Sequence, residues 1–212
     1  MTMPGPILIK QCPECGQYIR EQTIASGNTL GQKCWSDGKV EAPMLPEVPR
    51  AVLCPGCRKI VWIRELAVCE ALGGFFAQEN FRSDVGLAGR AKDWLPLEVN
   101  DYLLGLQQDL PEDKESFLRI RLWWCGNDPL RRGEQRTRSA DEIGNMERLI
   151  MQLPDDDQKT SLMKADLLRS LRRFGEAEKL LNTFQYPARE EWVVAKLLEM
   201  VAAEDACIAR LY

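Results

Sequence analysis

CPECGQYIREQTIASGNTLGQKCWSDGKVEAPMLPEVPRAVLCPGCRK, residues 12–59, is the stretch that decides the fold, because a Cys-Pro-x-Cys motif stands at each of its ends. Cys12 and Cys15 form the first motif, and Cys54 and Cys57 form the second. Two residues between cysteines let the backbone turn tightly enough for both sulfurs to reach one ion, and two such motifs complete a tetrahedral zinc site. The spacing therefore predicts one structural Zn²⁺ held by these four cysteines.

Two other interpretations of the motifs stay open. A single Cys-x-x-Cys is also typical of thioredoxin-like dithiols, but here the motif occurs twice and no βαβ pattern surrounds it. The four thiols could also be unrelated and free. Histidine is absent from the 212 residues, so a zinc site must use thiolates or carboxylates, and the commonest general base is missing.

The remaining four cysteines are expected to play other parts. Cys69 and Cys207 lie in apolar stretches that we expect to be helical, and Cys125 follows two tryptophans, so all three are predicted to be buried small hydrophobic side chains. Cys34 lies between the two motifs. It is either near the metal or separate from it, because the tetrahedron is complete without it.

The segment between the motifs predicts a β-hairpin, with Asp37-Gly38 as its turn. Three prolines in residues 42–49 favour an extended return to the second motif. Residues 10–65 thus resemble a zinc ribbon with a long insertion. This stretch is similar to the head of uncharacterised bacterial proteins with an N-terminal zinc ribbon and a tetratricopeptide-like helical tail, and this resemblance implies a fold but no biochemical activity.

The pattern becomes helical after the second motif. A short helix is expected from Arg64 to Gly73-Gly74, followed by a connector and then helices. Ser139-x-x-Glu142 is a capping box that opens one helix. The predicted domains are a zinc-ribbon domain at 1–74, a connector at 75–98 and a helical domain at 99–212, which makes the fold class α+β.

Within the helical domain, LRRFGEAEKLL at residues 171–181 resembles the middle of a tetratricopeptide-like repeat. Arg172 stands where a glycine is usual, and no second copy appears at a 34-residue period. An ordinary helical bundle would bury the same apolar stripe and stays open as the alternative. Residues 189–200 and 204–212 are expected to form a final helix pair.

WWCGNDPLRRGEQRTR at residues 123–138 is the strongest candidate outside the cysteines. Trp124, Asp128, Arg131 and Arg132 are predicted to form a recognition patch for an acidic partner or a phosphate, because arginine forks suit both. In the alternative interpretation the tryptophans pack in the core, residues 127–129 turn the chain between helices, and the arginines are solvated.

These features favour a non-enzymatic zinc-binding protein-interaction module, an adaptor or regulator whose partner is another protein. A nucleic-acid-associated zinc-ribbon regulator is the alternative, although the net charge of −4 disfavours it. An enzyme that uses Asp or Glu has no positive support. No apolar run approaches the roughly 20 residues needed to cross a bilayer, and the first residues lack a signal-peptide pattern, so we expect a cytoplasmic protein with no membrane partner.

Overall fold

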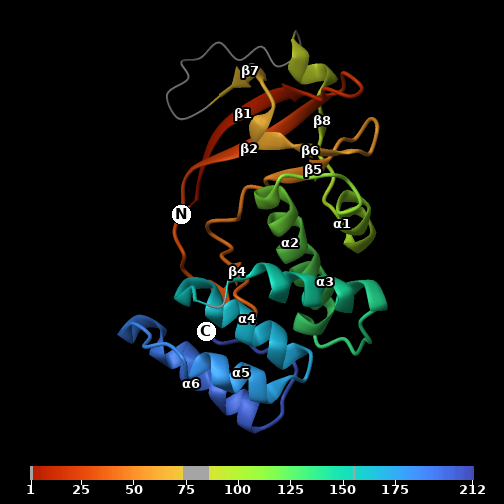
Figure 1. The fold of residues 1–212 in the computed structure, drawn as a ribbon. Coiled ribbons are helices and arrows are strands. Elements are labelled where there is room, and N and C mark those ends of the chain that lie inside the picture. Colours follow the sequence, from red (N-terminus) through yellow and green to blue (C-terminus); the bar gives the residue numbers. More distant parts are fainter. Residues whose placement is uncertain (1, 74–85, 155) are drawn as a thin grey trace. The chain divides into compact units, whose positions relative to one another are not determined.

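The computed structural model describes residues 2–73, 86–154 and 156–212, and it consists of two compact units (Figure 1). The β unit contains the chain up to Gln32 together with residues 42–97. The helical unit contains residues 33–41 together with residues 98–212. The α+β class is therefore confirmed. Whether 1–74, 75–98 and 99–212 behave as separate domains stays a prediction, and Gly74 and residues 75–85 of the expected connector lie outside the described residues.

The β unit is built on a four-stranded sheet in the order β7-β1-β2-β8. The long strands β1 (Met3–Gln11) and β2 (Tyr18–Ser26) are antiparallel, and β7 (Val68–Leu72) pairs antiparallel with the other side of β1. The short β8 (Lys92–Asp93) runs parallel to β2. The tight connection between β1 and β2 contains the first cysteine motif, so the sheet fixes the position of that motif.

A buried ion pair lies within this sheet. Lys10 Nζ lies 2.7 Å from Glu21 Oε2, and the two side chains are only 5% and 4% exposed. The same ammonium group donates a hydrogen bond of 2.6 Å to the carbonyl of Ile63. Because a charge buried without a partner is costly, the two groups depend on each other.

A second, two-stranded sheet carries the other cysteine motif. Strands β5 (Ala51–Leu53) and β6 (Ile60–Trp62) are antiparallel and are followed by the 3₁₀ turn η1 (Ile63–Glu65); a further 3₁₀ turn, η2 (Leu87–Arg90), precedes β8. The core of the β unit includes a cluster of apolar side chains from both sheets and from η1 together with two cysteines: Cys12, Ile19, Val52, Cys54, Val61 and Ile63.

Six α-helices are found among the described residues of the helical unit. Their bounds are α1 (Val99–Gly105), α2 (Glu112–Arg131), α3 (Ala140–Gln152), α4 (Gln158–Ser170), α5 (Phe174–Leu181) and α6 (Ala188–Ala202). The predicted capping box opens α3, because Ser139 accepts from the Glu142 amide and Glu142 accepts from the Ser139 amide. The helical core is contributed by α2 to α6 and includes Trp123, Met146, Leu149, Leu167, Leu168, Ala177, Leu181, Leu197 and Val201.

The hairpin β3 (Lys33–Cys34) and β4 (Val40–Glu41) belongs to the helical unit, although it lies between the two cysteine motifs in sequence. Its turn has the expected Asp37-Gly38, with Gly38 at a φ of 78°. The last residues of the chain run beside it, since Trp35 and Arg210 form an antiparallel bridge. Proximity in sequence predicts that this segment is part of the zinc-ribbon domain, and its hydrogen bonds are to α2, α4 and the last residues of the chain.

Three local predictions were wrong. The stretch expected to be a helix from Arg64 to Gly73 contains η1 and the strand β7, because these residues complete a sheet on the edge of β1. Residues 127–129 do not turn the chain between helices but lie inside α2, which tolerates Pro129 in its last turn. Residues 204–212 do not form a helix, since the tail is bonded to the hairpin instead.

Candidate metal centre

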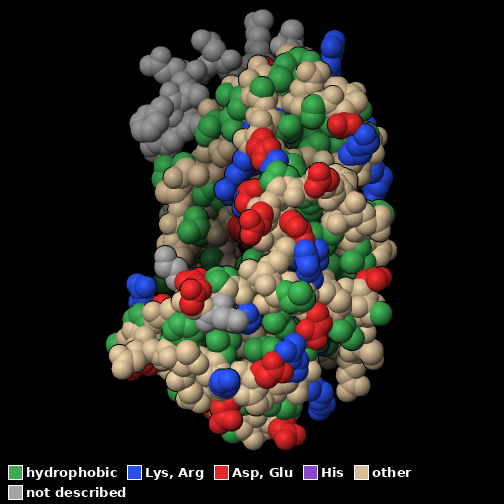
Figure 2. All heavy atoms as spheres, in the orientation of Figure 1, with side chains coloured by type: hydrophobic (Ala, Val, Ile, Leu, Met, Phe, Trp, Pro, Cys, Tyr) green, Lys and Arg blue, Asp and Glu red, His purple; other side chains and the backbone are tan. Residues whose placement is uncertain are grey.

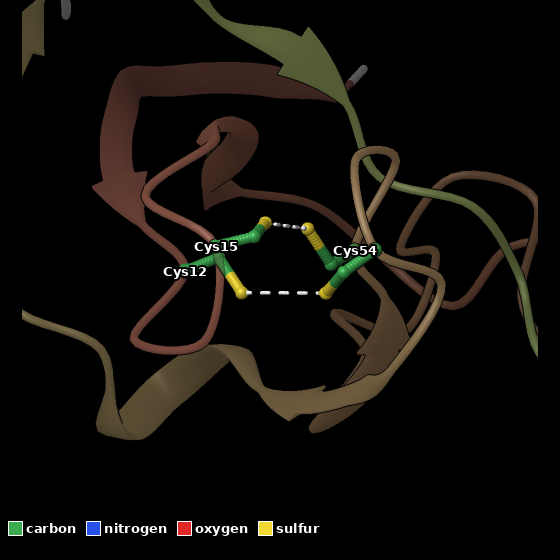
Figure 3. A group of neighbouring side chains, drawn as sticks. Cys12, Cys15 and Cys54 are labelled. Atoms are coloured by element: carbon green, nitrogen blue, oxygen red, sulfur yellow. Dashed lines mark hydrogen bonds between the residues drawn. The ribbon is translucent and has the colours of Figure 1, made fainter.

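The four predicted cysteines meet in the β unit. The sulfurs of Cys12, Cys15, Cys54 and Cys57 all lie within 4.8 Å of one another. Cys12 Sγ lies 3.9 Å from Cys57 Sγ, and Cys15 Sγ lies 3.6 Å from Cys54 Sγ, so each motif faces the other across the site (Figure 3). The fold therefore brings the two motifs together although they are far apart in the sequence, and the four thiols form one cluster.

These distances fit a metal ion rather than a pair of disulfides. A disulfide holds two sulfurs about 2.05 Å apart, far closer than the observed separations. Tetrahedral thiolates bound at ~2.3 Å lie roughly 3.8 Å from one another. All four cysteines are free thiols. The cluster could hold one metal ion without a rearrangement of the backbone.

Both motifs have the same backbone geometry. The amide of Gly16 donates to the carbonyl of Cys12 at 3.0 Å, and the amide of Arg58 donates to the carbonyl of Cys54 at 2.9 Å. The amides of Cys12 and Cys54 in turn donate to the carbonyls five residues later, at 2.9 and 3.0 Å. The chain thus forms two equivalent turns, which present their paired sulfurs in the same way.

The residue after each motif adopts a left-handed backbone. Gly16 has a φ of 73°, and Arg58, at the equivalent position, has a φ of 56°. Glycine reaches this region without strain, whereas a side chain disfavours it by roughly 1–2 kcal/mol. The second turn therefore adopts the same left-handed conformation as the first, but with a conformational strain at Arg58 that Gly16 does not have.

Gly56 is needed for a different reason, which is close approach between the two turns. A Cβ atom at Gly56 would lie 3.2 Å from Cys15 Sγ and 3.0 Å from Gln17 Cβ. The Gly56 amide also lies 3.4 Å from Cys54 Sγ, to which it donates. A larger residue here would push the second turn away from the first.

Burial divides the four thiols into two kinds. Cys12 and Cys54 are buried, and desolvation raises the pKa of Cys12 and raises the pKa of Cys54 to about 12. Cys15 is exposed, and a hydrogen bond from the Gln17 backbone lowers its pKa to about 7. A bound cation would favour all four thiolates, because metal coordination displaces the thiol proton.

The other cysteines lie outside this cluster. Cys69 and Cys207 are exposed, so the prediction that they are buried was wrong: Cys69 is in strand β7, and Cys207 is in the non-helical tail. Cys125 is partly buried in α2, and burial raises its pKa. Cys34 lies in β3 of the helical unit, where its carbonyl accepts from the Leu211 amide at 2.8 Å.

Three residues of the predicted arginine patch lie around the hairpin. Arg131 is only 3% exposed and forms ion pairs with Asp37 and Asp128. The Trp124 indole donates to the Asp37 carbonyl at 3.0 Å. Arg132 is exposed and pairs with Glu134 instead. The Arg131 guanidinium is thus already paired within the chain.

Asp37 anchors the hairpin in a way that the sequence did not reveal. It was expected only to form a turn, yet its side chain is fully buried and its carboxylate accepts from Asn127 Nδ2 at 2.8 Å. Burial raises the pKa of Asp37, and Arg131 and Asn127 oppose that shift. No local signal could have shown this, because Asp-Gly is typical of any hairpin turn and the partners lie about 90 residues away.

Comparisons of the chain with protein-family models, with curated proteins and with solved structures found no match. None of the described helices is long and apolar enough to cross a membrane.

Proposed function

We propose that this chain is a non-enzymatic protein-interaction module, an adaptor or regulatory protein, with one structural zinc ion bound by Cys12, Cys15, Cys54 and Cys57. The observation that carries the proposal is the cluster of four sulfurs within 4.8 Å. An all-thiolate tetrahedron suits zinc or iron, and a site with four protein ligands leaves no open position for a substrate. The ion's part is thus to hold the two turns together.

The small core of the β unit supports a structural role for the ion. Apart from the cysteines, the cluster of buried side chains around the two motifs has four apolar members among the described residues, Ile19, Val52, Val61 and Ile63. Small domains with so little buried apolar surface commonly depend on a metal or a disulfide for stability. The cysteines reach into this core, so an ion bound there would join both sheets.

The exposed apolar side chains of the helices support protein interaction. Met151 at the end of α3 is 75% exposed, and Trp192 on α6 is 47% exposed. Tryptophan and methionine are enriched at protein interfaces. A helical unit with tetratricopeptide-like packing would present such side chains to a partner protein.

Metal analysis of the purified chain tests the first part of the proposal. We expect about one zinc per chain and a colourless protein, because Zn²⁺ has no d–d absorption whereas iron thiolate sites are coloured. A Cys207→Ser variant, altered at an exposed cysteine outside the cluster, should keep the zinc. A metal-free wild-type protein that is nevertheless folded in the β unit would overturn the proposal.

Partner capture tests the second part. A specific protein that copurifies with the wild-type chain should be lost with Met151→Glu or Trp192→Ala, while far-UV circular dichroism stays unchanged. If those variants and the wild type recover the same proteins, the helical surface is not the interaction site.

A nucleic-acid role remains the alternative because exposed arginines lie near the cluster. Arg58 follows the second motif, and Arg90 lines an open hollow together with Cys15 and Gly56. Against it, Lys and Arg side chains are interspersed with Asp and Glu on the face shown in Figure 2. Retention on heparin that disappears steeply with added salt would favour this alternative.

A further inference from the structure

The hairpin between the two cysteine motifs is bonded to the helical unit through its backbone. The Ser36 amide donates to the Ala209 carbonyl at 2.9 Å, and the Cys34 amide donates to the Tyr212 carbonyl at 3.1 Å. The Leu211 amide donates back to Cys34 at 2.8 Å. Residues 33–41 therefore act as a strand-like partner for the C-terminal tail.

Buried side chains also anchor this hairpin, in addition to its backbone hydrogen bonds. Asp37 is fully buried and is held by the Arg131 guanidinium and by Asn127. Arg169, which is itself fully buried, donates to Ser36 Oγ at 3.2 Å. If the hairpin left, these arginines would lose partners within the unit, so the helical unit depends on the hairpin for its full stability.

The chain on both sides of the hairpin leads to the cysteines. Residues 16–32 connect it to Cys15, and residues 42–53 connect it to Cys54, and both of these flanks belong to the β unit. When the β unit is unfolded, the hairpin is joined to α1 only through the flexible chain of residues 42–97. When the β unit is folded, residues 42–73 and 86–97 of that chain belong to its compact structure, so less chain is free to move.

A shorter free loop favours docking of the hairpin. The entropic cost of bringing two chain segments together grows with the length of flexible chain between them, and a short tether raises the effective concentration of one segment near the other. Folding of the β unit should therefore stabilise the helical unit through the covalent chain that joins them.

We propose that metal binding at the four cysteines controls how firmly the hairpin of residues 33–41 is held in the helical unit, so that the metal centre regulates the stability of the helices. This inference rests on the proposed metal site. It adds a regulatory link between that site and the surface on which a partner protein would bind. The link runs through the covalent chain and through the anchoring of Asp37.

Hydrogen exchange on the full chain, with Zn²⁺ bound and after its removal by a chelator under reducing conditions, tests the link. We expect peptides covering residues 33–41 to exchange on the order of tenfold faster in the zinc-free protein, because the free loop is longer. The thermal midpoint of the helical signal should fall by roughly 5 °C. The Cys207→Ser variant should respond to zinc removal as the wild type does.

Variants in the hairpin show whether it carries the effect. In Asp37→Ala the anchor is already lost, so zinc removal should change the helical midpoint much less than in the wild type. If Asp37→Ala does not fold, Lys39→Ala removes a second anchor of the hairpin, because Lys39 is partly exposed and pairs with Asp128 on α2. Its response to zinc removal should be smaller than that of the wild type, although less reduced than in Asp37→Ala. An equal response of wild type and hairpin variants to zinc removal would overturn the inference.

The outcomes also separate this inference from the proposed function. If zinc binds, and its removal loosens peptides of β5 and β6 but leaves residues 33–41 and the helical midpoint unchanged, the link is wrong and the zinc site stands. If no metal binds to the cluster, the proposed function and the inference fail together.

Discussion

Arg58 is the residue at which the two cysteine turns differ most. It takes the left-handed position that Gly16 takes in the first turn, and its side chain is exposed. The arginine thus strains the backbone of the metal site without evident compensation from its side chain.

Exchanging the residue types at these two positions should change stability in opposite directions. Arg58→Gly should stabilise the β unit by about 0.5–1 kcal/mol, because relief of the strain exceeds the added entropy of the unfolded chain. Gly16→Ala should destabilise it by about 1 kcal/mol, since space for the methyl group exists but the φ of 73° is unfavourable. Urea unfolding of the two zinc-loaded variants measures both; changes of the same sign would contradict the equivalence of the two turns.

The thiol protons should make the affinity of the cysteine cluster for the proposed Zn²⁺ depend on pH. At neutral pH the buried Cys12 and Cys54 carry protons, because burial raises the pKa of both thiols, that of Cys54 to about 12. Zinc binding must release those protons, so affinity should fall as pH is lowered, by roughly tenfold per pH unit for each proton released. Below pH 7 the fall should steepen, since Cys15, with a pKa of about 7, then also carries a proton.

Competition with a chromophoric chelator at pH 6, 7 and 8 measures this dependence, once the chelator's own titration is subtracted. An affinity that stays constant over this range would mean that the buried thiols are already deprotonated in the zinc-free protein.

Among the helices, α3 is the one whose first residue the sequence predicts most clearly, through the capping box of Ser139 and Glu142. Ser139→Ala removes the hydroxyl that accepts from the Glu142 amide and should destabilise the helical unit by about 1 kcal/mol. Ser139→Asp should be close to neutral, because aspartate is an equally good cap. Thermal unfolding followed at 222 nm distinguishes the two variants, and equal losses in both would show that the hydroxyl has another role.

Local signals explain why some elements were predicted correctly. The cysteine motifs, the Asp37-Gly38 turn and the Ser139 capping box each depend on residues within a few positions of one another, and all three are present. The four candidate ligands could therefore be named from spacing alone. The surface on which the proposed partner protein would bind could not be predicted in this way.

The long strands β1 and β2 were missed because their pattern is broken. Prolines and a glycine open β1, and strand alternation would require apolar side chains where Lys10 and Glu21 are buried. Those charges are acceptable only as a pair across two strands, which no local window reveals. β7 was mistaken for a helix for a related reason: its pairing with β1 decides its structure, and its own five residues do not.

The position of the hairpin in the helical unit could not be predicted from the sequence, because it depends on contacts between distant segments. Residues 33–41 lie between two cysteine motifs, so proximity in sequence assigned them to the zinc ribbon. Their partners are on α2, α4 and the last residues of the chain. Long-range hydrogen bonds and the ion pairs of Asp37 with Arg131 and of Lys39 with Asp128 hold the hairpin there, and a single sequence carries no record of them.

For the whole molecule, loss of one ligand should affect the two units differently. Cys12→Ser or Cys54→Ser should lose zinc and unfold the β unit, because structural zinc contributes ~10 kcal/mol or more, comparable to the whole stability of a small domain. The helical unit has its own core and should stay largely helical at 25 °C.

Zinc content, circular dichroism at 222 nm and limited proteolysis together check this expectation, with Cys69→Ser as the matched control in the β unit. Collapse of the helical signal along with the zinc would show that the helices cannot fold without the β unit, and the predicted division into domains would then be wrong.

The ion pair of Lys10 and Glu21 also determines how the first two strands align. If β2 slid along β1 by one residue, Glu21 would turn to the opposite side of the sheet and leave the ammonium group of Lys10 without its carboxylate. Misaligned arrangements are therefore penalised by an isolated charge as well as by misplaced apolar side chains. An ion pair that adds little net stability can in this way select one register during folding, because the neighbouring registers leave a buried charge without its partner.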